Sequence, residues 1–271
     1  MNRAKLLLAT VAFFMMALPA LAAPVQAVNV GLQDVIDTVE KSFRTDPSTG
    51  LSPLTTVTAD FFQRSTLAAQ KKELRADGQM FLRVATNRDP LMFRFDYFRP
   101  MQQEIVCNGS TLWIYLPENR QVIINNVQSV FNPYTFDPGT DHASNFLQGL
   151  PRLSRDFQIT FSPQGRDIAG NYILDCTPRR SSVSVAHLYI VVSRDAVLSY
   201  VRSGRNIRTS FASLGQQEWA FPILSTTLVD HRDNTTVIEF SNVKTNILLS
   251  DGLFTFATPP GVEVVKPPRR H

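Results

Sequence analysis

The stretch that decides the fold runs from Gly78 to Leu116 and reads GQMFLRVATNRDPLMFRFDYFRPMQQEIVCNGSTLWIYL. Large apolar side chains recur at every second position through most of it, with polar or charged residues between them. Successive side chains of a β-strand point to opposite faces, so this pattern predicts consecutive strands with one apolar and one polar face. The apolar set comprises Met80, Leu82, Val84, Leu91, Phe93, Phe95 and Tyr97.

The dipeptide Asn108-Gly109 lies between two of these predicted strands. Asn-Gly favours a tight hairpin turn, because both of its central residues adopt positive φ at low cost. The strands should therefore pair antiparallel. We expect a curved sheet whose concave side carries Met80, Phe93, Phe95 and Tyr97.

A helix and a series of short strands are predicted around this core stretch. Apolar residues recur at helical spacing between Asn29 and Arg44, which predicts an amphipathic helix before the sheet. The strands follow one another at short, even intervals, which indicates a meander. They are expected at residues 57–68, 72–84, 91–98, 103–108, 111–116, 119–125, 157–161, 172–177, 187–192, 196–201, 226–229, 235–241 and 253–256.

The segment from Asn126 to Asp156 interrupts the meander with prolines and aromatic residues. It could be a plain surface connection or a lid over the concave face. A plain connection does not need so many large apolar side chains, so we favour a lid. Its expected apolar contacts are Phe146, Leu147 and Leu150, which share one face of a short predicted helix.

The first 22 residues have the features of a secretory signal peptide: Arg3 and Lys5, then an apolar run, then Ala20-Leu21-Ala22 as a cleavage site. A membrane anchor would need about 20 apolar residues, and this run is shorter and contains Pro19. We therefore expect residues 23–271 as a single mature domain. Its 25 Lys and Arg against 23 Asp and Glu give no reason to expect nucleic acid as a partner.

No catalytic site, metal site or cofactor is predicted from the remaining residues. The four histidines lack the spacing of a metal motif, and no nucleophile elbow or phosphate-binding loop occurs. Cys107 and Cys176 could form a disulfide in an oxidising compartment, but their spacing leaves this open. Arg202, Arg205 and Arg208 could bind an acidic partner or simply face solvent.

Several phrases resemble the family of outer-membrane lipoprotein carrier proteins, the LolA family. NGSTLWIYLPENRQV at Asn108 to Val122 and LFTFATPPGVEV at Leu253 to Val264 are similar to two of its patterns. LDCTPRR and IVVSRDAVL resemble its mid-chain strands. The resemblance covers nearly the whole mature chain.

The resemblance implies a mainly β fold: an incomplete antiparallel β-barrel of about eleven strands, closed by a lid of short α-helices around an apolar cavity. In this reading the segment 202–221 is an extra hairpin. Arg88 is a possible lid tether, although the family's arginine directly precedes the proline that corresponds to Pro90, where this chain has Asp89. The expected cavity residues are Met80, Leu82, Leu91, Phe93, Phe95 and Tyr97.

The resemblance also implies a function without catalysis. We expect a monomeric periplasmic chaperone that binds the acyl chains of lipoproteins. An ATP-driven release complex of the inner membrane would load it, and an outer-membrane lipoprotein receptor would unload it. The alternative is a periplasmic lipid- or lipoprotein-sensing module of a stress regulator, which would bind a partner without passing cargo on.

Overall fold

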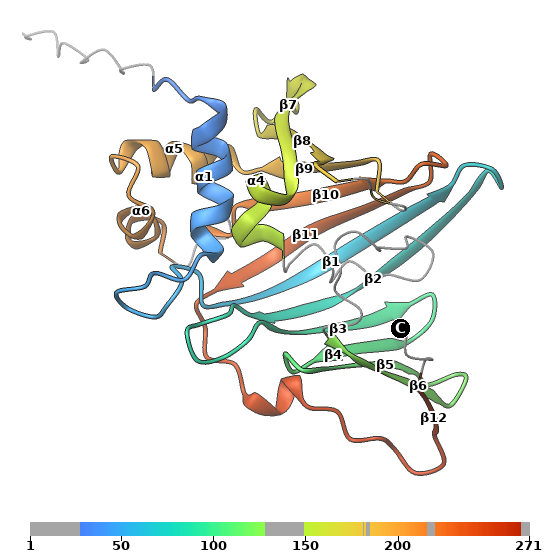
Figure 1. Cartoon of the computed structure of the whole chain (residues 1–271). Coiled ribbons are helices and arrows are strands. Elements are labelled where there is room, and N and C mark those ends of the chain that lie inside the picture. Colours follow the sequence, from blue (N-terminus) through green and yellow to red (C-terminus); the bar gives the residue numbers. More distant parts are fainter. Residues whose placement is uncertain (1–27, 128–148, 181, 183–184, 216–219, 267–271) are drawn as a thin grey trace, which may run out of the picture.

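The computed structural model describes residues 28–127, 149–180, 182, 185–215 and 220–266. Within these residues, twelve strands form one curved sheet (Figure 1). The strands are β1 (Thr56–Leu67), β2 (Lys72–Arg83), β3 (Met92–Arg99), β4 (Gln103–Cys107), β5 (Thr111–Leu116), β6 (Gln121–Asn126), β7 (Phe157–Arg166), β8 (Tyr172–Pro178), β9 (His187–Val192), β10 (Ile223–Val229), β11 (Thr235–Thr245) and β12 (Glu263–Val265).

The strand order is β12-β6-β5-β4-β3-β2-β1-β11-β10-β9-β8-β7, so β12 and β7 are the two edges of an open sheet. Neighbouring strands are antiparallel except β12, which pairs parallel with β6. The predicted mainly β, antiparallel and unclosed sheet is confirmed, with twelve strands in place of about eleven.

Four α-helices occur in the described residues: α1 (Leu32–Phe43), α4 (Leu153–Asp156), α5 (Arg194–Arg202) and α6 (Ile207–Leu214). Helix α1 stands at one end of the concave side, with α4 on one side of it and α5 and α6 on the other (Figure 1). The N-terminus of α1 is capped from within, because the Gly31 N–H donates to Asp34 Oδ2 over 3.0 Å. The predicted helix after residue 29 is therefore confirmed.

Two predicted strands are wrong. Residues 196–201 lie in helix α5, because Ser193 caps its first turn and Ala196, Val197 and Tyr200 are buried at helical spacing. Residues 253–256 include the end of a 3-10 helix, η3 (Asp251–Phe254). The segment 202–221 was predicted as an extra hairpin, but its described residues contain helix α6 and no strand. Its status as an insertion stays a prediction.

The chain after β11 covers the convex side of the sheet. Phe254 is buried there under the Arg83 guanidinium, which lies 4.9 Å from the ring centroid. Phe256 contacts the rings of Trp113 and Tyr115 at centroid distances of 6.5 and 5.4 Å. The motif that resembled a family signature thus forms a strap, residues 251–265, that ends in β12.

Candidate ligand-binding face of the sheet

The predicted cavity residues lie on one face of two neighbouring strands. Met80 pairs with Phe95, and Leu82 pairs with Phe93, in the antiparallel register of β2 and β3. All four side chains are fully buried, and Tyr97 is 6% exposed. Leu91 is half-buried and packs against the same cluster. The structure therefore brings the six residues together on the concave side.

Strand β1 adds residues that the sequence analysis did not include. Val57, Ala59 and Phe61 are buried in the same cluster. The Phe61 ring makes edge-to-face contacts with Phe95 at 5.5 Å and Tyr97 at 4.8 Å. The alternation in TVTADFFQ could have identified them, because every second residue of that strand is apolar or small.

Gly78 makes this aromatic packing possible. A Cβ built at this position would lie 2.0 Å from the Asp96 carbonyl oxygen and 2.8 Å from the Phe61 ring. Gly78 also pairs with Tyr97, so the two rings of Phe61 and Tyr97 meet over the place where a side chain is missing. Only glycine fits there without displacing the backbone of β3.

Helix α1 covers one end of the apolar face. Val35, Val39 and Phe43 are buried in the cluster that contains the sheet residues. Phe43 contacts Phe221 at 6.1 Å, and Phe221 contacts Phe240 of β11 at 5.6 Å. The sequence predicted the amphipathic helix but did not assign it to the site, since periodicity shows an apolar face and not what the face covers.

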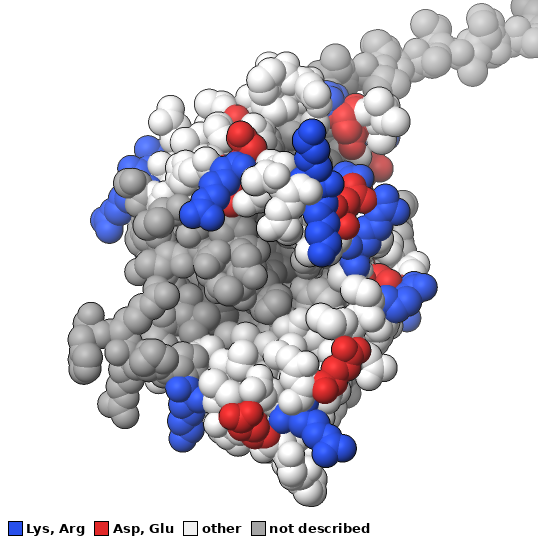
Figure 2. All heavy atoms as spheres, turned by 90° about the vertical axis from the view of Figure 1, so that its right-hand side faces the viewer, with Lys and Arg blue, Asp and Glu red and all other residues white. Residues whose placement is uncertain are grey.

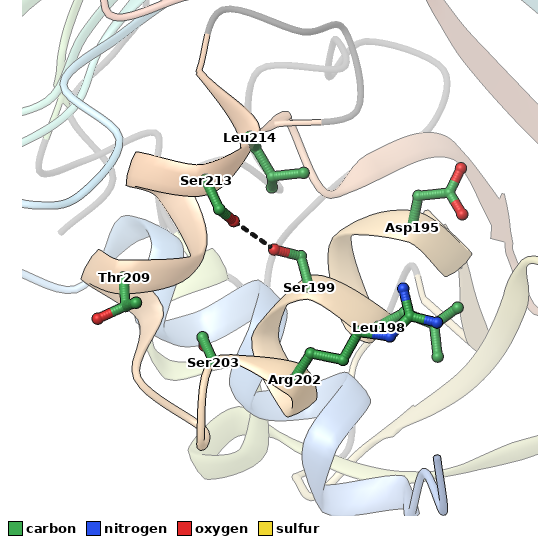
Figure 3. A pocket seen from close by; sticks show the side chains of 8 residues that line it. All are labelled: Asp195, Leu198, Ser199, Arg202, Ser203, Thr209, Ser213 and Leu214. Carbon is green, nitrogen blue, oxygen red and sulfur yellow. Dashed lines mark hydrogen bonds between the residues drawn. The ribbon is translucent and has the colours of Figure 1, made fainter. Parts of the chain in front are cut away.

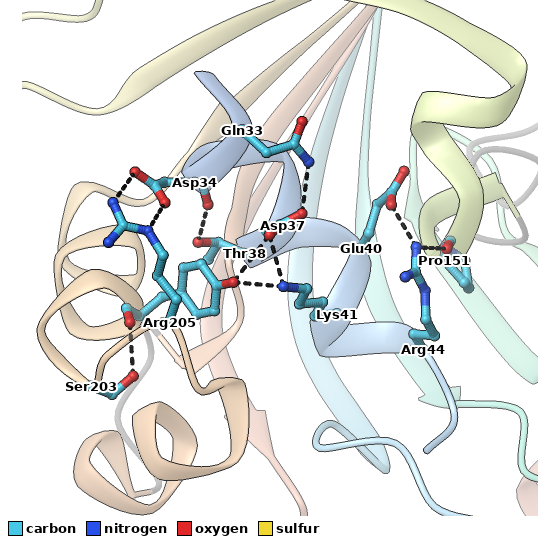
Figure 4. A network of polar contacts seen from close by, with 11 residues as sticks. Gln33, Asp34, Asp37, Thr38, Glu40, Lys41, Arg44, Pro151, Ser203 and Arg205 are labelled. Atoms are coloured by element: carbon cyan, nitrogen blue, oxygen red, sulfur yellow. Dashed lines mark hydrogen bonds and ion pairs between the residues drawn. The ribbon is translucent and has the colours of Figure 1, made fainter. Parts of the chain in front are cut away.

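A polar network holds the outer face of α1 against α5 and α6 (Figure 4). The Arg205 guanidinium donates to both carboxylate oxygens of Asp34, at 2.6 and 3.0 Å. This contact is the main reason that the pKa of Asp34 lies below its ordinary value. One helical turn further on, Lys41 donates to Asp37 over 2.7 Å and to the Tyr200 hydroxyl over 2.8 Å.

Burial raises the pKa of Asp37, but hydrogen bonds from Lys41 and Gln33 outweigh that effect, so the pKa is lowered. Burial likewise lowers the pKa of Lys41, and its bonds to Asp37 and Tyr200 more than offset this. Both groups are therefore charged at neutral pH. This ion pair lies within α1, and hydrogen bonds of both groups with the Tyr200 hydroxyl join it to α5.

The other flank of α1 contacts the chain just before β7. The Glu40 carboxylate accepts from Arg44 and from the Ser154 N–H, each over 2.6 Å. Leu150, in the short helix η1 (Leu150–Arg152), is fully buried in the same apolar cluster. Of the predicted lid residues, Leu150 therefore packs beside α1.

Phe146 and Leu147, the other predicted lid residues, lie outside the described residues. Arg88 is exposed in the loop between β2 and β3, where its backbone N–H donates to Thr86 Oγ1. Its guanidinium makes no hydrogen bond or ion pair within the described part of the chain. The lid tether stays a prediction.

Cys107 and Cys176 are free thiols, on β4 and β8. Six strands separate these two strands in the sheet order, so the two cysteines do not form a disulfide. Burial raises the pKa of Cys107 to about 11 and raises that of Cys176 as well. Both side chains belong to the concave apolar cluster.

A pocket of about 520 Å³ lies outside this face, between α5 and α6 (Figure 3). Ser199 and Ser213 face each other across it, with their hydroxyl oxygens 3.0 Å apart. Arg202 lines the same pocket. Arg205 pairs with Asp34 and Arg208 with Asp46, so these two arginines bind acidic groups of the chain itself.

The end of the molecule at the right of Figure 1 carries Lys and Arg interspersed with Asp and Glu, without a field of one sign (Figure 2). Among the described residues, no group of three or more His, Cys, Asp or Glu side chains is placed to hold a metal ion. Within the same residues, no helix has the length and apolar character needed to span a bilayer.

Several known proteins are similar to this chain. Residues 52–137 match the family model described as outer membrane lipoprotein carrier protein LolA. The outer-membrane lipoprotein carrier protein of Legionella pneumophila (strain Paris) is 25% identical over 218 residues, which cover 80% of this chain and 86% of that protein. The protein of the same name from Histophilus somni (strain 2336) is 24% identical over 214 residues, 79% and 82% of the two chains.

Among solved structures, a LolA superfamily protein from Nitrosomonas europaea is 15% identical, with a TM-score of 0.38 over 84% of this chain and 99% of that one. Fold and site define a mainly β protein with an open, curved sheet and an apolar concave face that helices cover at one end. The resemblance seen in the sequence is confirmed: the chain matches the LolA family model over residues 52–137 and is similar, at 24–25% identity, to outer-membrane lipoprotein carrier proteins.

Proposed function

We propose that this protein is a periplasmic chaperone that carries lipoproteins by binding their acyl chains on the concave face of the sheet. The observation that supports this most directly is the apolar face itself. Met80, Leu82, Phe93 and Phe95 are fully buried together on two neighbouring strands of an open sheet. The relatives named as lipoprotein carriers make acyl chains the natural ligand class.

The physical problem that such a carrier solves is the cost of exposing acyl chains to water. Burial of each methylene is favourable by about 0.8 kcal/mol of free energy. A lipid-modified protein therefore does not leave a membrane unaided. The ligand must replace contacts that the empty protein makes with itself. In this proposal α1, Leu150 and the predicted lid residues Phe146 and Leu147 give up such contacts when acyl chains enter.

The proposed route has two partners. An ATP-driven lipoprotein release complex of the inner membrane loads the carrier, and an outer-membrane lipoprotein receptor unloads it. The signal peptide at residues 1–22 would direct the chain to the periplasm, where residues 23–271 act as one domain. No step requires a catalytic residue or a cofactor.

The test is the release of a radiolabelled lipoprotein from inner-membrane vesicles into solution. Wild-type protein should release it. Phe93→Ala should not, whereas Phe254→Ala, which removes an equally buried ring from the convex side, should release it normally. Both substitutions should cost about 3–5 kcal/mol of stability, so they are matched in that respect. Where a variant is unfolded by circular dichroism, leucine replaces alanine in both.

Failure of the wild type to release lipoprotein would contradict a carrier and favour the sensing module. Equal release by the two variants would contradict the concave face as the binding site.

A further inference from the structure

The concave face changes character along its strands. On β1, the inward side chains run from Val57, Ala59 and Phe61, which are buried, to Gln63 and Ser65, which are half-buried and polar. On β11, the inward series ends with Ile238, which is buried, and then Thr236, which is half-buried. The end away from α1 is therefore polar on both strands.

These polar side chains are connected across the sheet. The Tyr97 hydroxyl on β3 donates to Gln63 Oε1 over 2.9 Å, and Gln63 Nε2 donates to Ser65 Oγ over 3.3 Å. Ser65 Oγ and Thr236 Oγ1 are 3.3 Å apart and form one hydrogen bond, in which either hydroxyl can be the donor. We call Gln63, Ser65, Tyr97 and Thr236 the polar belt. The small residues Gly78 and Ala76 of β2 lie beneath it, opposite Tyr97 and Gln63.

The polar belt has more hydrogen-bond donors than its own acceptors use. Ser65 and Thr236 share a single hydrogen bond, so one of their two O–H groups is left to donate in either arrangement. The Gln63 amide has a second N–H with no acceptor among the described residues. A half-buried donor at this position can pair with an acceptor group of a ligand that reaches the same depth.

We propose that the polar belt binds the ester carbonyl groups of a diacylglyceryl lipid, and so fixes how deeply the acyl chains enter the apolar part of the face. An acyl chain becomes polar at its carbonyl group and nowhere else. At the belt, the inward side chains of β1 and β11 change from apolar to polar, between Leu74 of β2 and Leu228 of β10 on the same face. The acyl chains would lie along Phe61, Phe93 and Phe95, with the glyceryl group toward the open end. This inference rests on the proposed function, because it concerns the same face.

The test compares two lipids that differ only in their carbonyl groups: dipalmitoylglycerol, a diester, and the corresponding dihexadecylglycerol, a diether. Each is used to displace diphenylhexatriene, a fluorescent hydrocarbon, from the purified protein. Wild type should prefer the diester by about ten-fold, since each carbonyl gains a hydrogen bond that the ether cannot form. The double variant Ser65→Ala/Thr236→Val and the variant Gln63→Leu should bind both lipids with less than a two-fold difference.

Thr66→Val is the matched control, because Thr66 follows Ser65 on β1 and its side chain points to the opposite face. It should keep the full preference for the diester. Equal binding of the two lipids by wild type, or an unchanged preference in the belt variants, would overturn the belt proposal and leave the carrier proposal standing. If wild type bound neither lipid, both proposals would be wrong.

Discussion

Arg205 and Asp34 form a two-pronged ion pair that joins the loop between α5 and α6 to the first turn of α1, with nitrogen–oxygen distances of 2.6 and 3.0 Å. The same Asp34 carboxylate caps α1 through the Gly31 N–H. One side chain therefore both starts the helix that covers the apolar face and attaches it to its neighbours. The position of α1 depends on the charge of Asp34.

This dependence predicts a loss of stability in acid. The folded-state pKa of Asp34 is lower than the ordinary value of 3.8, so its contribution is complete above that value and disappears as the pH falls through the folded-state pKa. In Asp34→Asn, the free energy of unfolding should be lower than in wild type at pH 7, and the difference should shrink below about pH 4. Urea titrations over this pH range measure it.

Asp251→Asn is the control, since Asp251 is largely exposed in its pair with Arg83. It should leave both the stability and its pH profile unchanged. A stability difference for Asp34→Asn that stays constant down to low pH would contradict the role assigned to the charge.

Gly78→Ala should destabilise the protein by about 1–3 kcal/mol, because the new methyl group would collide with the Asp96 carbonyl oxygen and the Phe61 ring. Urea denaturation followed by circular dichroism measures this. Gly149→Ala, where a methyl group would meet nothing within 4 Å, should be close to neutral. Similar costs at both positions would show that the tight packing at Gly78 is not what matters.

The two thiols should be unreactive in the folded protein. Both are buried with raised pKa values, and Cys107 reaches about 11, so neither forms a reactive thiolate at pH 8. A thiol-specific colorimetric reagent should detect no cysteine in native protein and two after denaturation without reductant. Detection of none after denaturation would reveal a disulfide that the structure does not contain.

The strap should be detectable through Trp113, whose indole lies beside Phe256. Phe256→Ala removes the ring contacts to Trp113 and Tyr115, which should cost about 1–3 kcal/mol and shift tryptophan emission to the red. The measurement is made with the chain's other tryptophan, Trp219, replaced by Phe. An unshifted spectrum would mean that Trp113 is not shielded by the strap.

The sequence predicted the sheet better than its surroundings, for a physical reason. Alternation at every second residue places Phe93 and Phe95 on one face whatever pairs with them, and their antiparallel neighbours follow from short turns. The segment around Val197 was predicted as a strand because apolar residues were counted without its Ser193 cap, which starts a helix.

The role of α1 could not be predicted in this way. Its apolar stripe is visible in the sequence, but the partners of Asp34 and Lys41 lie more than 150 residues away, at Arg205 and Tyr200. Likewise, the polar side chains of Ser65 and Thr236 look like ordinary strand residues until the register of β1 and β11 places them opposite each other. Contacts between distant segments carry this information, and local patterns do not.

The strap on the convex side contacts β2 at Arg83 and β5 at Trp113 and Tyr115, independently of the contacts on their inner face. These strands are therefore held by contacts on their convex side as well as by packing on the concave face. Side chains on the concave face can therefore rearrange while the strands that carry them keep their positions.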